Sequence, residues 1–210
     1  MKLIKSTFFP IVPMAAMRAT QNMSWIAAIT EEEAAAQDAK WVLRDTSIGP
    51  MYVKIRTDRK TGQMKEYARK SPPNYVRQRR HLIAHYENKR AIKEYADQIG
   101  FSMPEDCYMI VIRFPMPKSW TKKKKKYMAS ERHKSRPDKD NCEKGIIDAI
   151  YYQDKASRFH RKKGDAGDAM ISSGGVIKIW CEPDKEPGFV INEYDRKEWD
   201  ECFIDAQQKL

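Results

Sequence analysis

The chain has 210 residues, 41% of them apolar and 33% charged, and its formal net charge is +11. This length and apolar content suit one domain with a buried core and exclude a fully disordered chain. The positive charge favours a nucleic acid or an anionic membrane surface as the partner, rather than an acidic small molecule.

The first half of the chain is expected to alternate between strands and helices. Residues 2–20 are typical of a strand that ends at two prolines, and residues 23–43 are typical of an Ala-rich and Glu-rich helix. Residues 51–57 alternate Tyr, Lys and Arg with Val, Ile and Thr, which predicts a strand. After a Pro-Pro-Asn start signal, residues 75–99 predict a long basic helix.

The second half is expected to contain three strands around one more helix. Residues 107–114, 175–181 and 189–194 are predicted strands, and residues 138–151 are the predicted helix. Residues 118–134 are expected to form a basic flexible loop. We therefore expect a single α+β domain over residues 1–210, in which helices pack on a mixed β-sheet.

Neither a targeting segment nor a framework of disulfide bonds or zinc-binding cysteines is expected. No run of about 18 apolar residues occurs, so no membrane-spanning helix is expected, and a membrane is not among the predicted partners. The N-terminus lacks the apolar centre of a signal peptide. The cysteines contain no Cys-x-x-Cys pair, which is typical of a reducing compartment. The predicted location is cytoplasmic. The four cysteines are Cys107, Cys142, Cys181 and Cys202.

The basic loop is a candidate for binding the phosphates of a nucleic acid. It contains an unbroken lysine run without interleaved aromatic residues, so it offers charge but no recognition of bases. A solvated loop is the plainer interpretation, and the two are compatible. The candidate DNA-binding residues from this region are Lys122, Lys123, Lys124, Lys125, Lys126, Lys134 and Arg136.

A cluster of acidic residues follows in this strongly basic region. Asp140, Lys144 and Asp148 are spaced four residues apart and share one face of the predicted helix. The opposite face carries apolar residues that can pack on a sheet, namely Cys142, Ile146 and Ile150. Asp138 and Asp140 alternate where the chain enters the helix, and carboxylate oxygens are ligands that Mg²⁺ prefers. An ordinary capped helix with surface ion pairs explains the spacing equally well.

The motif around this helix resembles the signature of the RusA family of Holliday junction resolvases. Residues 136–150 read Arg-Pro-Asp-Lys-Asp-Asn-Cys-Glu-Lys-Gly-Ile-Ile-Asp-Ala-Ile, and Phe-Pro-Met-Pro-Lys-Ser-Trp precedes the lysine run. The positions that match the family pattern are Pro137, Asp138, Asp140, Asn141, Lys144, Asp148 and Ala149. The resemblance is best over residues 105–195 and absent from residues 24–50, which predicts an N-terminal insertion there.

The resemblance implies the role of each residue. Asp138 and Asp140 would be catalytic metal ligands, and Lys144 would stabilise charge on the scissile phosphate. Asn141 would position the loop or the DNA backbone, and Asp148 would be a further ligand or would orient Lys144. The implied cofactor is Mg²⁺, with Mn²⁺ as a substitute, and the implied partners are four-way junction DNA and a second copy of the chain. Such an enzyme would act in DNA recombination and repair.

Two residues compete for the remaining catalytic and metal-binding carboxylate of the family. Asp154 follows the helix closely, whereas choosing Asp168 requires a long insertion and places a Gly/Ser-rich stretch where strand residues are expected. Choosing Asp154 lets residues 158–163 pair with residues 176–180 as a hairpin, so Asp154 is favoured. Two other functions stay open, a non-catalytic basic DNA-binding protein and a nuclease for flaps or forks.

Overall fold

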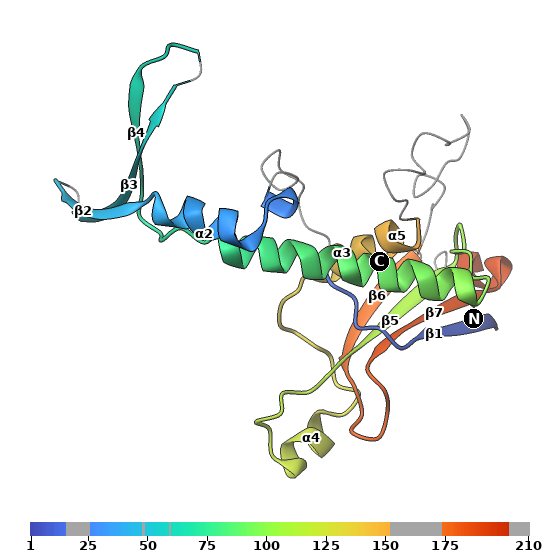
Figure 1. Ribbon diagram of the computed structural model, residues 1–210. Helices are drawn as coiled ribbons and strands as arrows, with labels where there is room; N and C mark the ends of the chain where they lie inside the picture. The colour runs from blue at the N-terminus through green and yellow to red at the C-terminus, as the bar shows by residue number, and fades with distance from the viewer. Residues whose placement is uncertain (16–25, 48, 59, 152–173, 202–210) are drawn as a thin grey trace. The chain divides into compact units, whose positions relative to one another are not determined.

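The computed structural model describes residues 1–15, 26–47, 49–58, 60–151 and 174–201 (Figure 1). The chain divides into two compact units, Met1–Met17 with Glu87–Leu210 and Arg18–Tyr86. Helices and two sheets make up the described residues, which confirms the predicted α+β class. No helix among these residues has the length and apolar composition needed to cross a membrane.

The larger unit is built on a four-stranded mixed sheet. Its strands are β1 (Leu3–Phe9), β5 (Tyr108–Phe114), β6 (Gly174–Trp180) and β7 (Gly188–Tyr194), in the order β1-β7-β5-β6. β5 and β6 are parallel, and the other two pairs are antiparallel. Parallel neighbours need a crossover connection, and α4 (Lys122–Met128) and α5 (Lys139–Ile150) lie between β5 and β6 in the chain.

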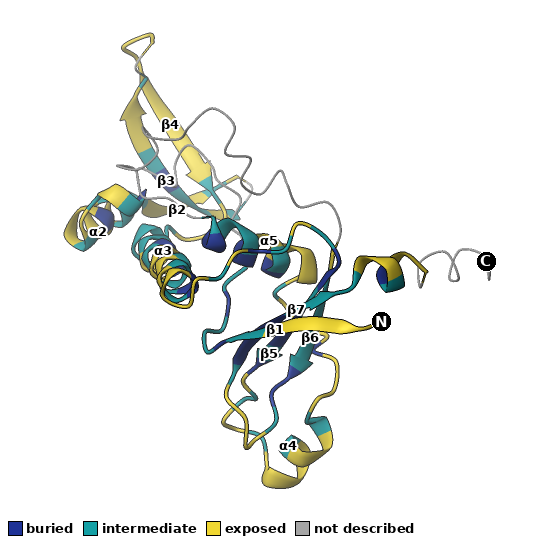
Figure 2. Ribbon diagram, turned by 90° about the vertical axis from the view of Figure 1, so that its right-hand side faces the viewer, coloured by how far each residue is buried: buried dark blue, intermediate teal, exposed yellow. Residues whose placement is uncertain are grey.

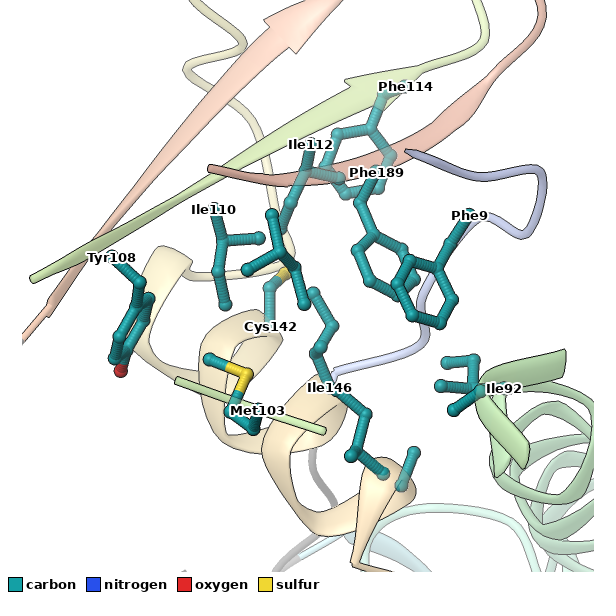
Figure 3. Close-up of a cluster of buried hydrophobic side chains, with 14 of the residues drawn as sticks. Phe9, Ile92, Met103, Tyr108, Ile110, Ile112, Phe114, Cys142, Ile146 and Phe189 are labelled. Carbon is teal, nitrogen blue, oxygen red and sulfur yellow. The ribbon is translucent and has the colours of Figure 1, made fainter. Parts of the chain in front are cut away.

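One face of this sheet carries the core. Burial along β5 alternates strictly, and Ile110 and Ile112 are fully buried. Cys142 and Ile146 of α5 are equally buried and belong to the same cluster, as does Ile92 from the last turns of α3 (Figure 3). The predicted apolar face of the helix is thereby confirmed.

The smaller unit contains a helix, a three-stranded antiparallel sheet and the start of a long helix. These elements are α2 (Glu31–Ala39), β2 (Val42–Thr46), β3 (Gly49–Thr57), β4 (Met64–Arg69) and α3 (Tyr75–Gln98), and the boundary between the units falls inside α3. The Asp38 carboxylate accepts hydrogen bonds from the backbone N–H groups of Tyr75 and Val76. It thus satisfies two of the donors that the first turn of α3 leaves without a helical partner.

Two sequence predictions of local structure are wrong. The helix expected over residues 23–43 ends at Ala39, and Val42–Thr46 is a strand because each of its residues pairs with β3. The basic loop expected over residues 118–134 contains the helix α4. The side chain of Thr121 caps α4 by accepting a hydrogen bond from the backbone N–H of Lys124, and lysine is itself a good helix former.

Candidate active site

Two exposed carboxylates stand at the beginning of α5. Asp138 occupies the N-cap position, but its side chain accepts no capping hydrogen bond. Asp140 lies in the first helical turn, and its side chain is 83% exposed. The positive end of the helix dipole favours negative charge at both positions. Because the Asp138 side chain accepts no capping hydrogen bond, the interpretation of this residue as an ordinary side-chain cap does not match the geometry.

A hollow of about 350 Å³ opens beside Asp138. It is lined by Arg132, His133, Lys134, Ser135, Asp138, Lys139, Val176, Ile177 and Lys178. Asp138 is the one acidic side chain among these lining residues, and four of the others are lysine or arginine. A phosphate group in the hollow would therefore meet a largely cationic wall next to a carboxylate.

Lys178 holds the chain that leads into α5. Its ammonium group donates hydrogen bonds to the carbonyl oxygen of Ser135, at 2.7 Å, and to that of Pro137. Lys178 pairs with Ile112 in the sheet register, so its side chain stands on the same face as the buried core. No motif or spacing in the sequence pointed to Lys178. The one local sign was that the strand period places this lysine on the side of the predicted strand that faces the core.

His133 packs into the structure beside the same hollow. Its ring lies 4.5 Å from that of Phe114 and 4.2 Å from that of Trp180, and its backbone N–H donates to the carbonyl of Lys178. Burial, followed by the positive charge of Lys178, lowers the pKa of His133. The ring is therefore favoured in its neutral form and anchors the segment before α5 to β6.

The outer edge of β6 bears on the choice of the third carboxylate. Backbone hydrogen bonds join Trp180 to Ser130 and Glu131, and His133 to Lys178. These bonds occupy the part of β6 that was expected to form a hairpin with residues 158–163. One reason for preferring Asp154 over Asp168 is thereby weakened. Both aspartates, like residues 158–163, lie outside the described residues.

Lys144 and Asp148 form an ion-pair cluster further along α5. One oxygen of Asp148 lies 3.9 Å from the Lys144 nitrogen, and the other lies 3.4 Å from that of Lys89 in α3. Eight residues of helix separate Asp148 from Asp140, a rise of about 12 Å. That distance supports a role for Asp148 in orienting Lys144 over a role as a ligand shared with Asp140. Lys89 could not be found from local sequence because it contacts α5 only through tertiary packing.

The other predicted DNA-binding residues lie on the surface. Asn141, Lys134 and Arg136 are exposed around the start of α5. The lysine run Lys122–Lys126 forms most of α4, in which Lys125 is half-buried and the other lysines are exposed. The Lys124 ammonium stands 4.3 Å from the centre of the Trp120 ring, so this helix is tied to an aromatic side chain at its base.

The donors present fit a magnesium ion. Within the described residues, no group of three or more His, Cys, Asp or Glu side chains is placed to hold a metal. Mg²⁺, however, is commonly bound through only one or two carboxylates, with waters and substrate phosphates completing its shell. Asp138 and Asp140, two residues apart and both exposed, are the carboxylates available for such binding.

Of the comparisons with known proteins, the comparison with protein families found a match. The family model described as Endodeoxyribonuclease RusA matches residues 53–158, half of the chain. The match begins after the predicted insertion at residues 24–50, shares residues 105–158 with the predicted best-matching region, and includes Asp154 but not Asp168. No curated protein and no solved structure was found to match the chain.

Proposed function

The chain belongs to the RusA family of endodeoxyribonucleases, and we propose that it is a magnesium-dependent nuclease that resolves four-way DNA junctions in recombination and repair. One observation supports this most directly. Asp138 and Asp140 present exposed carboxylates at the start of α5, next to a hollow whose other charged side chains are cationic. A polyanion and a divalent cation are the two ligands that such surroundings accommodate together.

The proposed reaction is hydrolysis of a phosphodiester. The oxygen of water forms a bond to phosphorus as the bond to the 3′ oxygen breaks, which leaves a 5′-phosphate and a 3′-hydroxyl. When bound by Asp138 and Asp140, Mg²⁺ would activate the water and offset the charge that develops on the phosphate. Mn²⁺ would serve as a substitute.

The protein's own side chains would position the substrate. Lys144, held by Asp148, places a positive charge one turn after Asp140 on the same face of α5. Such a charge stabilises the additional negative charge of the transition state. Asn141 is exposed on the first turn and would contact the DNA backbone. Lys178 would keep Asp138 at a fixed position through the two carbonyls that it binds.

The proposed assembly is a homodimer. A four-way junction is resolved only when two strands of like polarity are cut. A two-fold pair of identical sites meets that requirement with a single kind of interface.

The test compares carboxamide variants on a labelled four-way junction, with and without Mg²⁺. Asp138→Asn and Asp140→Asn should each abolish Mg²⁺-dependent cleavage, while junction binding survives because the cationic residues are intact. Asp184→Asn, at an exposed aspartate in the β6–β7 connection, is the matched control and should cleave like the parent. Cleavage within tenfold of the parent by either site variant would contradict the metal assignment.

The same assay separates the alternative functions. A non-catalytic DNA-binding protein would leave every substrate intact at any Mg²⁺ concentration. A nuclease for flaps or forks would cut those substrates faster than the four-way junction when all three are presented at equal concentration.

A further inference from the structure

The strands β3 and β4 of the small sheet separate their side chains into two chemically different faces. Residues directly opposite each other in an antiparallel pair project to the same side. The pairs between β3 and β4 are Tyr52 with Arg69, Lys54 with Tyr67, and Arg56 with Lys65. We call these six residues the ribbon face. It combines four cationic side chains with two tyrosines.

The opposite face of the same strands is apolar. It carries Met51, Val53, Ile55, Met64 and Ala68, and its charged residues Arg44 and Glu66 lie 3.7 Å apart as an ion pair. All the lysines and arginines of β3 and β4 are therefore on one side. Packing on a core does not account for this segregation along the outer part of the hairpin, because of these apolar residues only Val53 is buried, and Ile55 and Met64 are exposed.

The positive charge of the ribbon face is poorly neutralised. The strand β2 adds one carboxylate, Asp45, to the same side of the sheet. Within the part of the chain that the structure describes, however, no acidic side chain forms an ion pair with Lys54, Arg56 or Arg69, and Lys65 approaches Asp58 only to 3.9 Å. Partial burial lowers the pKa of Lys54, and the positive charges of Lys40 and Arg56 lower it further. Like charges held together in this way are unfavourable without an anion.

At the inner end of the ribbon face the side chains are held by contacts with an aromatic ring, whereas at the outer end they are exposed. The Lys54 ammonium and the Arg69 guanidinium lie over the Trp41 ring, at 5.4 and 5.6 Å from its centre. Such contacts hold the two long side chains in place. Arg56 and Lys65 are exposed beyond them, and Figure 2 shows most of β4 and the tip of the hairpin as exposed.

We propose that the ribbon face binds the sugar–phosphate backbone of a DNA duplex. The strand β2 pairs with β3 only as far as Val53, so the outer part of the sheet is a two-stranded ribbon of β3 and β4. Such a ribbon is narrow enough to follow the major groove. Lysine, arginine and tyrosine side chains are common donors to phosphate oxygens, and such contacts position a protein without reading sequence. This role rests on the proposed function in taking DNA as the ligand, and it assigns the ribbon face to an arm of that DNA.

The test uses the full-length protein and a short blunt duplex without divalent metal. Arg56→Gln with Lys65→Gln removes two exposed charges of the ribbon face. Lys2→Gln with Lys197→Gln, two exposed lysines of the other unit, removes the same charge as a control. Binding is measured over a range of NaCl concentrations, and thermal unfolding checks that each variant folds. The ribbon variant should bind roughly tenfold more weakly at low salt, and its slope of log affinity against log salt should fall by about 1.8.

Several outcomes decide between the interpretations. A ribbon variant that folds and keeps the salt slope of the parent overturns the proposal, as does a control variant that loses affinity equally. Loss of binding to anionic lipid vesicles with unchanged DNA binding would also overturn it and would assign the face to a membrane. Junction cleavage by the parent is measured in parallel. If the parent never cleaves but its duplex binding depends on the ribbon face, the proposed function fails and this inference stands.

Discussion

Replacing Lys178 with methionine tests whether this lysine positions the active site. Methionine keeps most of the length and apolar volume of the side chain but removes the ammonium group that binds the carbonyls of Ser135 and Pro137. Hydrogen bonds to a charged group are typically worth about 1.5–3 kcal/mol. Ser135 is exposed and Pro137 half-buried, so water can replace part of the loss.

We therefore expect Lys178→Met to lower the free energy of unfolding by about 1.5–3 kcal/mol in total, rather than by the sum of two full bonds. The effect on cleavage should be larger, because Asp138 directly follows Pro137. A displacement of about 1 Å at a reacting group costs roughly 100-fold in rate. Junction affinity should change little.

Urea unfolding gives the stability, and single-turnover cleavage with saturating enzyme separates rate from binding. Lys178→Arg retains the charge, so it should recover part of the cleavage rate that Lys178→Met loses. If the role of Lys178 were purely structural, the cleavage rate of each variant would change only in proportion to its free energy of unfolding. Lys2→Met is the control, and it should stay within about 0.5 kcal/mol of the parent. A Lys178→Met protein that cleaves within threefold of the parent would refute the positioning role.

Three further predictions concern other elements. Gly188→Ala should lower the free energy of unfolding in urea by about 2–4 kcal/mol, since a Cβ there would lie 2.1 Å from the carbonyl oxygen of Phe9; a loss under about 1 kcal/mol would contradict the contact. Replacing Lys122–Lys126 with glutamine, which keeps helix propensity, should weaken binding to all DNA forms and flatten its salt dependence, and an unchanged slope would show that α4 does not touch DNA. In parallel cleavage assays, Asp154→Asn should be inactive and Asp168→Asn nearly normal, and the reverse result would assign the third carboxylate to Asp168.

The features predicted correctly from the sequence depend on one element at a time. The two faces of α5 follow from the helical period alone, and both the buried Cys142 and the exposed Lys144 lie where that period puts them. The strand β5 was found because its apolar run, Tyr-Met-Ile-Val-Ile-Arg-Phe, lies between prolines. A single-element pattern needs no knowledge of what packs against it.

Most of the features that were missed depend on a partner distant in the chain. The helix α4 is the exception, because its Thr121 cap and its lysines are local. Val42–Thr46 is a strand because β3 lies beside it, although the Ala-rich residues before it favour a helix. Lys178 and Lys89 act on α5 from β6 and from α3, 41 residues away from Pro137 and 59 from Asp148 respectively. Spacing within a motif cannot reveal such contacts. A charged residue in the inward-facing phase of a strand is the one local sign that was available.

The proposed catalytic residues and the proposed DNA-binding residues lie on different elements of this chain. The residues proposed to cut stand on α5 and are held by Lys178, which stands on the core face of β6. The residues proposed to bind DNA stand on α4 and on the ribbon face, mostly at exposed positions, and none of them belongs to the buried core cluster. Surface charge can be removed at small cost in stability, whereas a core-facing lysine cannot. Variants of α4 or of the ribbon face should therefore raise the DNA concentration needed for half-maximal cleavage and leave the single-turnover rate intact. Variants at Asp138, Asp140 or Lys178 should lower the single-turnover rate and leave the DNA concentration for half-maximal cleavage nearly unchanged.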